Sequence, residues 1–450
     1  MTEMNRVDGV ESENAILVGV LTPGRSVYGD PLDELAGLAE TAGARVQARL
    51  TQRRDTPDKT TYLGKGKVEE LRDLAAAHDA DVIFFDNDLN PAQTRNLEKV
   101  TGTKVLDRTE LILDIFAGRA QTHEARLAVE LAQLEYSLPR LKRMWTHLSR
   151  LKMGIGMRGP GEKQIETDRR LVEKRIHDLR GDLRVIERRK QRQVAARRDR
   201  MTVSLVGYTN AGKSTLLNVL TGADVVAQDR LFATLDTRTR RWQLPGWGPV
   251  LLSDTVGFIR DLPHHLIASF KATLEEARQA DLLLHVADAA SPVAADQITS
   301  VYHVLEELGI EAKDTLLVLN KIDAAADRAR LDSLLEKYPN AIPVSAHSRR
   351  GLDGLASAVS DALSRAFADV DVETGVGNGR LLAQLAAHGE VLSKQYSDSR
   401  MTVHCRVPQG YLGRLQGEAD TSVRLHVNNN GAPADPPLNP LPPGAVEDVA

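Results

Sequence analysis

The sequence has very little cysteine and no long apolar run. Cys405 is the only cysteine, which excludes an internal disulfide and a cysteine-based zinc cluster and is typical of a reducing compartment. No apolar run approaches the ~18 residues that span a bilayer, and residues 1–14 lack the charged and apolar regions of a signal peptide. We therefore expect a soluble cytoplasmic protein without membrane insertion, with a disordered segment at 1–14.

The chain is long, and its charge is unevenly placed. Its 450 residues with 42% apolar content allow two or three domains, each with its own core. The net charge is only −4, yet residues 138–200 hold 20 Lys and Arg against 8 Asp and Glu. A basic segment on an acidic protein points to a polyanionic partner such as RNA. The alternative is a solvated helical face that is rich in arginine.

Hydrophobic patterns divide the chain into four folded parts. Residues 15–120 alternate short apolar runs (15–20, 45–50, 81–85, 104–106) with helical patterns (31–42, 67–78, 91–100), which predicts a small α/β domain with a largely parallel sheet. Residues 201–368 alternate in the same way, which predicts a second α/β domain. Residues 375–427 predict a small α+β domain, with a helix at 381–394 and strands at 401–407 and 422–427. Residues 428–450 are rich in proline, and we expect them to be disordered.

The segment 121–200 has the pattern of two long helices. Two apolar stripes repeat at spacings of three and four, and they are separated by the glycine-rich run 154–161. We predict an antiparallel coiled-coil hairpin with a kink at Pro139 and a second helix over about 162–198. The stripes are Leu127, Leu131, Leu134, Leu138, Leu141, Trp145 and Leu148, and then Val172, Ile176, Leu179, Leu183 and Ile186.

Residues 207–214 form a complete G-x-x-x-x-G-K-S phosphate loop between an expected strand (202–206) and an expected helix (215–220). Its glycines allow backbone N–H groups to surround phosphates. Lys213 is expected to reach the β- and γ-phosphates, and the Ser214 hydroxyl to bind Mg²⁺. The loop therefore predicts a site for a nucleoside triphosphate.

A second motif, Asn320-Lys321-Ile322-Asp323, selects guanine. The Asp323 carboxylate accepts hydrogen bonds from the ring N1–H and the amine of guanine, whereas adenine has no donor at N1. We expect Asn320 to brace the base, the Lys321 stem to stack on it, and the backbone of Ser345-Ala346 to contact the guanine oxygen. The predicted ligands are GTP and GDP.

Between these motifs lie the expected sensors of the γ-phosphate. Asp254 is expected to act on Mg²⁺ through water, the Gly257 amide to bind the γ-phosphate, and Thr234 to close over Mg²⁺. Lys213, Thr234 and Gly257 would then stabilise the transition state. The full set of predicted nucleotide contacts is Gly207, Tyr208, Thr209, Asn210, Ala211, Gly212, Lys213, Ser214, Thr215, Phe232, Ala233, Thr234, Leu235, Asp236, Asp254, Thr255, Val256, Gly257, Asn320, Lys321, Ile322, Asp323, Ser345, Ala346 and His347.

The order of these motifs resembles a translation-associated GTPase of the Ras-like superclass, and the segments 62–67, 158–162, 166–170 and 254–259 resemble the HflX family over about residues 15–430. The resemblance implies the four-part α/β architecture given above. It also implies binding to the large ribosomal subunit and its RNA, and GTP-dependent splitting or rescue of stalled or idle ribosomes.

Two residues raise questions about hydrolysis. Many Ras-like GTPases place a glutamine directly after the Asp-x-x-Gly motif to position water, but this chain has Phe258, so we expect slow intrinsic hydrolysis that the ribosome stimulates. Asn210 occupies a position where an asparagine coordinates potassium in some related GTPases, which gives the hypothesis of activation by K⁺.

Two alternatives stay open. An ATP-dependent RNA remodeller is one, because Gly64-Lys65-Gly66-Lys67 opens a helix and is a candidate phosphate or ATP contact. A GTPase that regulates a protein partner without RNA is the other. The candidate RNA contacts on the hairpin, Arg158, Lys163, Arg169 and Arg170, separate these alternatives through the salt dependence of binding. We expect a monomer.

Overall fold

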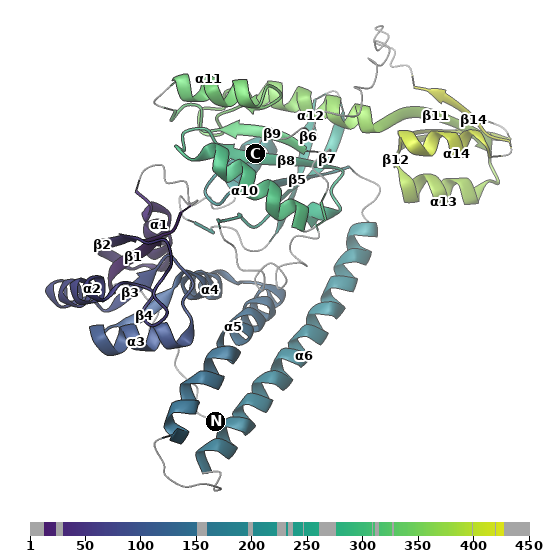
Figure 1. Ribbon diagram of the computed structural model, residues 1–450. Helices are drawn as coiled ribbons and strands as arrows, with labels where there is room; N and C mark the ends of the chain where they lie inside the picture. Colours follow the sequence, from purple (N-terminus) through teal and green to yellow (C-terminus); the bar gives the residue numbers. More distant parts are fainter. Residues whose placement is uncertain are drawn as a thin grey trace. The chain divides into compact units, whose positions relative to one another are not determined.

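The computed structural model (Figure 1) divides into two compact units, 1–363 and 364–450, which are described separately below. It describes residues 13–23, 30–150, 160–196, 201–222, 231–232, 237–245, 247–260, 276–307, 309–310, 315–325, 328–397, 399–418 and 420–426. The expected disordered segments 1–14 and 428–450 therefore lie almost entirely outside the described residues. The first unit holds two parallel sheets and a helical hairpin, and the second holds an antiparallel sheet.

The N-terminal part is a parallel four-stranded sheet with helices on both faces, as predicted. Its strands are β1 (Asn14–Leu21), β2 (Arg45–Arg53), β3 (Val82–Phe85) and β4 (Lys104–Asp107), in the order β2-β1-β3-β4. Helices α1 (Asp33–Ala42) and α4 (Arg108–Arg119) pack on one face, and α2 (Lys65–Ala77) and α3 (Pro91–Thr101) pack on the other. Alternate residues of β1 supply the two cores, with Leu17 in one and Ile16 and Val18 in the other.

Helix α4 was not predicted, because no loop separates it from β4. Asp107 is the last residue of the strand and also the N-cap of the helix, and its carboxylate accepts a hydrogen bond from the Glu110 N–H at 2.9 Å. Helix α3 has clearer signals: Pro91 is its first residue, and Asn90 and Gln93 form a capping box. Gly102, with φ of +74°, ends it.

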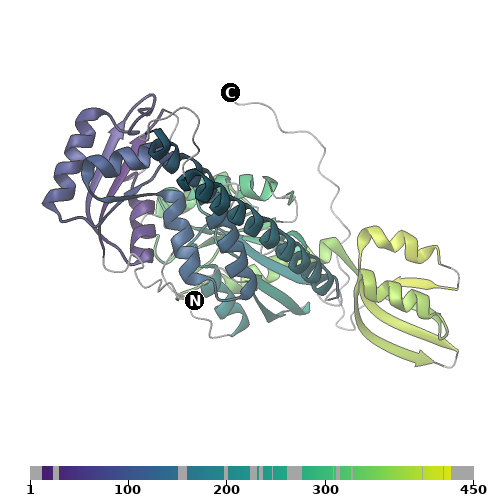
Figure 2. The ribbon, with the colours of Figure 1, turned by 90° about the horizontal axis from the view of Figure 1, so that it is seen from below.

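The segment between the two parallel sheets is the predicted antiparallel hairpin of α5 (His123–Arg150) and α6 (Pro160–Ala196), whose helices run side by side in both views (Figure 1 and Figure 2). The two apolar stripes meet in one cluster, in which Leu131, Ile176 and Leu179 are buried. Ion pairs at 2.7–2.8 Å join the helices along their length: Arg175 with Glu130, Arg180 with Glu135, and Lys190 with Glu124. Helix α5 continues through Pro139.

None of the described helices is both long and apolar enough to cross a membrane. The two hairpin helices have the length, but charged side chains interrupt their apolar stripes.

The second parallel sheet carries the nucleotide motifs. Its order is β10-β9-β8-β5-β7-β6, and only the edge strand β6 is antiparallel. The strands are β5 (Thr202–Gly207), β6 (Arg238–Leu244), β7 (Gly248–Asp254), β8 (Leu282–Asp288), β9 (Thr315–Asn320) and β10 (Ile342–Pro343), and the helices are α7 (Lys213–Thr221), α10 (Ala294–Glu307), α11 (Arg328–Lys337) and α12 (Leu352–Ala366). The P-loop GTPase fold that the sequence predicts is therefore present.

The C-terminal unit is an antiparallel sheet in the order β12-β13-β11-β14, with helices on one face. Its elements are β11 (Phe367–Gly375), α13 (Gly379–His388), β12 (Glu390–Ser397), β13 (Arg400–Pro408), the 3₁₀ turn η2 (Gln409–Tyr411), α14 (Leu412–Gln416) and β14 (Ser422–Leu425). The sequence analysis missed β11, which is an inner strand.

The predicted helix at 381–394 is wrong beyond His388. Gly389 ends α13 in an extended conformation, and a side chain there would meet the Arg406 carbonyl oxygen at 2.3 Å. The chain then continues into β12, where residues 390–397 pair with β13. A close approach of two backbones ends the helix, and the helical pattern alone does not reveal it.

Candidate nucleotide-binding site

The phosphate loop is built by glycines that no other residue can replace. Gly207 ends β5 with φ of +147°, and a Cβ atom there would lie 2.1 Å from the Val286 carbonyl oxygen. Gly212 has φ of +90°, and its Cβ would lie 2.4 Å from Asn320 Nδ2. Asn210, at φ of +60°, is the third residue with a positive φ in this loop. Backbone N–H groups in such a turn, followed by the N-terminus of α7, form an anion site.

Lys213 is buried at the base of this loop. Its Nζ donates hydrogen bonds to the carbonyl oxygens of Gly207 at 3.0 Å and Tyr208 at 2.9 Å. Burial lowers the pKa of the ammonium group to about 8, against the opposing effect of the Asp254 carboxylate. A phosphate beside Lys213 would supply the negative charge that favours its protonated form.

Ser214 and Asp254, the two residues predicted to act on Mg²⁺, lie in direct contact. The Ser214 hydroxyl donates to Asp254 Oδ2 at 2.5 Å, and Asp254 is fully buried at the end of β7. The next residue, Thr255, is also fully buried, and its hydroxyl donates to the Leu205 carbonyl oxygen at 2.6 Å, which fixes the turn after β7. A hydroxyl and a carboxylate are the oxygen donors that Mg²⁺ takes, so these residues fit the ion.

Gly257 lies directly against the phosphate loop. A Cβ atom on it would be 2.7 Å from Thr209 Cα and 3.0 Å from Lys213 Nζ. The backbone of Phe258 is bonded to the loop on both sides: its N–H donates to Gly207 O at 3.1 Å, and its carbonyl accepts from the Thr209 N–H at 2.6 Å. Gly257 therefore lies beside the phosphate loop and Lys213, as the predicted contact of its amide with the γ-phosphate requires.

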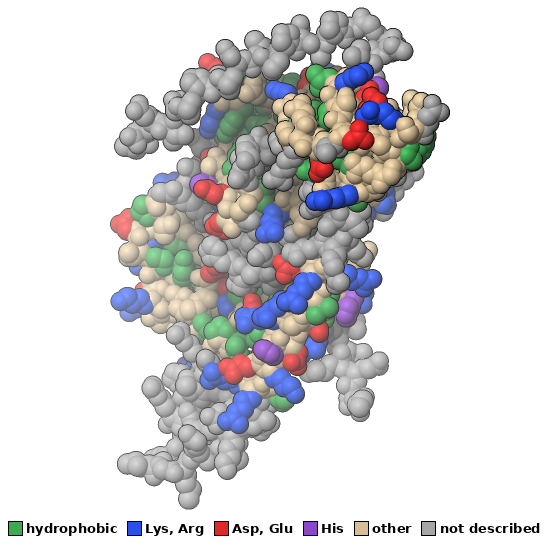
Figure 3. Space-filling view, turned by 90° about the vertical axis from the view of Figure 1, so that its right-hand side faces the viewer, with side chains coloured by type: hydrophobic (Ala, Val, Ile, Leu, Met, Phe, Trp, Pro, Cys, Tyr) green, Lys and Arg blue, Asp and Glu red, His purple; other side chains and the backbone are tan. Residues whose placement is uncertain are grey.

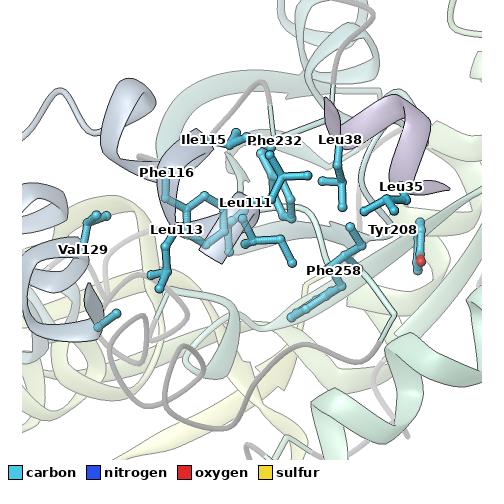
Figure 4. Packing of buried hydrophobic residues seen from close by; sticks show 14 of the residues in the cluster. Leu35, Leu38, Leu111, Leu113, Ile115, Phe116, Val129, Tyr208, Phe232 and Phe258 are labelled. Carbon is cyan, nitrogen blue, oxygen red and sulfur yellow. The ribbon is translucent and has the colours of Figure 1, made fainter. Parts of the chain in front are cut away.

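Phe258 is a packing residue. Its side chain is 2% exposed and belongs to an apolar cluster with Leu35 and Leu111 of the N-terminal part (Figure 4). Phe232 enters the same cluster, and its ring meets that of Phe116 edge-on at 4.7 Å. The ring of Phe258 therefore takes no part in orienting water, in agreement with the sequence analysis.

The residues predicted to recognise guanine converge at the ends of β9 and β10. Asn320 is buried and joins two loops: its amide donates to Ala211 O at 2.9 Å, and its oxygen accepts from the Ala346 N–H at 3.0 Å. Asn320 thus links the phosphate loop to the segment after β10. The Lys321 ammonium lies 2.9 Å from Asp288, at the end of β8.

Asp323 is the exposed acid of this group. A hydrogen bond from Ser345 lowers the pKa of its carboxyl group, so it is ionised at neutral pH. His347 Nδ1 lies 3.7 Å from Asp323 Oδ2, with the side chain 91% exposed. A charged acceptor beside open space fits the N1–H and amine donors of guanine.

Some predicted contacts cannot be placed. Ala233, Thr234, Leu235 and Asp236 lie outside the described residues, as does Arg158 on the hairpin loop. Phe232, which precedes Ala233, is described, and its N–H donates to Thr209 Oγ1 at 2.8 Å.

Sequence reasoning missed a buried ionic cluster beside the phosphate loop, made by Glu34, Asp86 and Arg108 of the N-terminal part with Tyr208 and Arg260. Arg108 pairs with Asp86 at 2.8 Å and with Glu34 at 3.0 Å, and Arg260 pairs with Glu34 at 3.3 Å. We refer to these five residues as the domain clamp. No local motif signals it, because Glu34 and Tyr208 are 174 positions apart.

Tyr208 is the centre of the domain clamp. Its hydroxyl donates to the Glu34 carboxylate and accepts from the Arg260 N–H at 2.7 Å. Arg108 also donates to the Arg260 carbonyl at 3.2 Å. Burial opposes ionisation of Glu34, but Arg108 and Arg260 hold the pKa of its carboxyl group below the usual value. The clamp therefore ties the N-terminal part to the phosphate loop and to the segment after Gly257.

The candidate RNA contacts that can be described lie along α6. Arg169 pairs with Glu173 on the same helix at 2.8 Å, Arg170 is exposed, and Lys163 lies near the start of the helix. The face of the molecule in Figure 3 shows Lys and Arg side chains lying among Asp, Glu and His.

Comparisons with known proteins cover most of the chain. Three family models match consecutive segments: GTP-binding GTPase N-terminal (29–117), GTP-binding GTPase Middle Region (119–197) and 50S ribosome-binding GTPase (202–321). The chain is 46% identical over 413 residues to a GTPase HflX of Magnetococcus marinus, covering 91% of this chain and 95% of that protein. It is 44% identical over 402 residues to a GTPase HflX of Escherichia coli, covering 88% and 94%.

Among solved structures, the chain resembles a GTP-binding protein from the archaeon Sulfolobus solfataricus in complex with GDP. The TM-score is 0.42 at 25% identity, covering 78% of this chain and 99% of that one.

Proposed function

The chain belongs to the GTPase HflX family, and from that premise we propose a GTP-gated factor that binds the large ribosomal subunit and, in its GTP-bound state, splits or rescues stalled or idle ribosomes. The observation that carries the proposal is a guanine-nucleotide site joined within one compact unit to a long hairpin with a basic helix. The match of 202–321 to the model of 50S ribosome-binding GTPases supports the choice of partner.

The protein is a GTPase, and its residues have assignable roles. Ser214 would hold Mg²⁺ directly and Asp254 would hold it through water, and the ion would neutralise the charge that develops on the phosphates. Lys213 and the Gly257 amide would stabilise the γ-phosphate, and Thr234 would close over the metal. Asp323 would select guanine, with Asn320 holding the surrounding loops in place.

Hydrolysis is proposed to be slow without the ribosome. The position after Gly257 holds a buried phenylalanine, which cannot orient water. Binding to the ribosome would then complete the site by supplying the missing group. Asn210 is exposed on the phosphate loop, so it remains available as the potassium ligand of our hypothesis.

The alternative of ATP chemistry in the N-terminal part gains no support from the geometry near Gly64. The Gly64 N–H is bonded to Gln52 Oε1 at 2.9 Å, and a Cβ there would lie 2.6 Å from the Arg54 guanidinium. The Gly64 amide is therefore already engaged by a side chain of β2, and ATP binding there stays an untested prediction.

Sedimentation with ribosomes and separated subunits tests the main proposal. We expect co-migration with the large subunit, and loss of intact ribosomes, when a non-hydrolysable GTP analogue is present. GDP should weaken both effects, and ATP should leave them absent. If the protein associates with no ribosomal particle under any nucleotide, the proposal fails and a partner protein must be sought.

Removing basic side chains of the hairpin distinguishes binding to ribosomal RNA from binding to a protein partner that contains no RNA. The variant with both Arg169 and Arg170 changed to Gln should lower ribosome affinity and reduce the salt slope by about 2, with nucleotide affinity unchanged. Changing two exposed basic residues of α11, Arg328 and Lys337, to Gln is the matched control. Equal affinities for the two variants would contradict RNA binding by α6.

A further inference from the structure

The face of the C-terminal sheet away from its helices carries two histidines and two aspartates. Asp369 and Asp371 alternate with the buried Val370 and Val372 along β11, so they point away from the core. His404 lies directly opposite Asp371 on β13. His426 follows β14, and its N–H donates to the Asp369 carbonyl at 2.9 Å, which extends the pairing of β14 with β11. Three adjacent strands thus bring these side chains together.

The side chains are arranged as metal ligands are. One donor atom each from Asp371, His404 and His426 lies within 4.8 Å of the other two, and the three side chains are half-buried. The two imidazole rings stack, with centroids 3.7 Å apart and an angle of 20° between planes. Within the parts of the chain that the structure describes, this is the one group of three or more such side chains with this spacing.

The closest pair of donors is now joined by a hydrogen bond. His426 Nδ1 lies 2.8 Å from Asp371 Oδ2. A tetrahedral ion with bonds of about 2.0–2.1 Å places its ligand atoms roughly 3.3 Å apart. An ion would therefore replace this hydrogen bond and move the two atoms slightly apart, while the three strands keep the side chains on one face.

Asp369 has the place of an orienting carboxylate. Its Oδ1 lies 2.6 Å from His404 Nε2, so the other ring nitrogen of His404 is left for a ligand. A carboxylate on the far nitrogen fixes the ring and raises its basicity, as in many metal sites. Arg406 Nε lies 3.5 Å from the other Asp369 oxygen, which favours this orienting role over direct ligation.

We propose that Asp371, His404 and His426 form a site for a divalent transition-metal ion of the zinc type, with Asp369 as the orienting carboxylate. Two nitrogens and one carboxylate oxygen suit Zn²⁺ and Co²⁺, whereas Mg²⁺ takes oxygen ligands. A fourth position stays open to water. Because His426 follows the short strand β14, the bound ion would fix this edge strand to β11 and β13.

Isothermal titration of the tag-free, full-length protein with Zn²⁺, in saturating Mg²⁺ and GDP to occupy the nucleotide site, tests the proposal. We expect one zinc ion per chain. The variants Asp371→Asn and His426→Gln should each weaken affinity by about 10–100-fold, and Asp369→Asn by about tenfold. The control is His303→Gln, at an exposed histidine of α10, which should bind zinc as the unchanged protein does.

A second readout covers the case in which a variant is destabilised. Co²⁺ should give the intense visible absorption of a tetrahedral site in the unchanged protein, lost on adding Zn²⁺. Zinc should also slow amide exchange in β14 of the unchanged protein and have no such effect in Asp371→Asn. The proposal is overturned if zinc binds with equal affinity to Asp371→Asn and His303→Gln. It is also overturned if the unchanged protein binds no zinc ion other than one that enters the nucleotide site.

Discussion

The two parallel sheets of the first unit carry groups of opposite charge preference at the carboxyl ends of their strands. The carboxyl end of β5 leads into glycines, backbone amides and Lys213, which suit an anion. The carboxyl ends of β3 and β4 carry Asp86 and Asp107 instead. Open α/β sheets bind ligands at this edge, where the strand order reverses. One sheet thus presents an edge for a phosphate, and the other presents an edge for cations.

The cationic groups that contact Asp86 and Asp107 are arginine side chains from other segments of the first unit. Asp86 pairs with Arg108 and Arg260, and Asp107 pairs with Arg140 of α5 at 2.7 Å. The Tyr136 hydroxyl of α5 also donates to Asp107, at 2.5 Å. The N-terminal sheet therefore uses its ligand edge to hold the hairpin and the segment after Gly257. The second sheet thus has glycines and a lysine at its carboxyl end and is suited to a nucleotide. The N-terminal sheet has aspartates there and binds arginines of neighbouring segments.

The domain clamp should be the most sensitive part of the acidic edge. Glu34→Ala leaves the Tyr208 hydroxyl without its acceptor and removes one carboxylate from the buried Arg108, which we expect to destabilise the contact by about 2–4 kcal/mol. Hydrogen exchange of the Arg260 amide measures this loss. Glu40→Ala, at an exposed position of the same helix α1, is the control; equal exchange in the two variants would mean that the clamp contributes nothing.

Guanine recognition is the sharpest test of the phosphate-binding edge. Asp323→Asn replaces a charged acceptor with an amide, so GTP affinity should fall by about 2–3 kcal/mol, or roughly 30–150-fold. A xanthine nucleotide, which has a carbonyl in place of the amine, should bind the variant better than GTP does. Equilibrium titration with fluorescent nucleotides gives both values. Asp332→Asn, at an exposed position of α11, is the control and should leave GTP affinity unchanged.

The phosphate-binding edge was easier to predict from the sequence than the acidic edge, because its residues are close together in the sequence. Residues 207–214 and 320–323 are contiguous motifs, so their glycines, lysine and aspartate reveal the site directly. The domain clamp joins Glu34, Asp86 and Tyr208 across long separations, and only the packed fold brings them together.

The same reason explains the errors in the fold. Strand β11 has alternating buried and half-buried residues that the sequence analysis overlooked, whereas the end of α13 depends on the contact of Gly389 with Arg406 on another strand. Predictions from hydrophobic stripes did well on the hairpin, since each stripe lies within one helix.

Nucleotide binding at the phosphate loop should depend on pH through Lys213, because this lysine attracts a phosphate only when it is protonated. The pKa of Lys213 is about 8, and bound phosphate would raise it. Nucleotide binding should therefore weaken as pH rises above about 8, by up to roughly tenfold per unit. Titrations between about pH 7 and about pH 9 measure this, and Lys213→Arg is the control, since arginine stays protonated. An equal slope in both proteins would contradict the assignment.

The smallest expected effect lies on the acidic edge, at Glu110. Burial, followed by the charge of Asp107, raises the pKa of the Glu110 carboxyl group to about 7. The folded protein therefore binds this proton more tightly than the unfolded chain, so the stabilisation is complete below the unfolded pKa and is lost as pH rises through about 7. Glu110→Gln keeps a neutral side chain at every pH. At about pH 8 it should be more stable than the unchanged protein by about 1–2 kcal/mol, and near pH 4 the two should agree.

Urea denaturation at both pH values measures this difference, with Glu69→Gln on the exposed face of α2 as the control. A gain in Glu110→Gln that is the same at both pH values would come from packing. A gain that appears only at the higher pH would show that the acidic edge already holds as many negative charges as its arginines can balance. That outcome would explain why the N-terminal sheet binds cationic side chains at the edge where the second sheet has its phosphate loop.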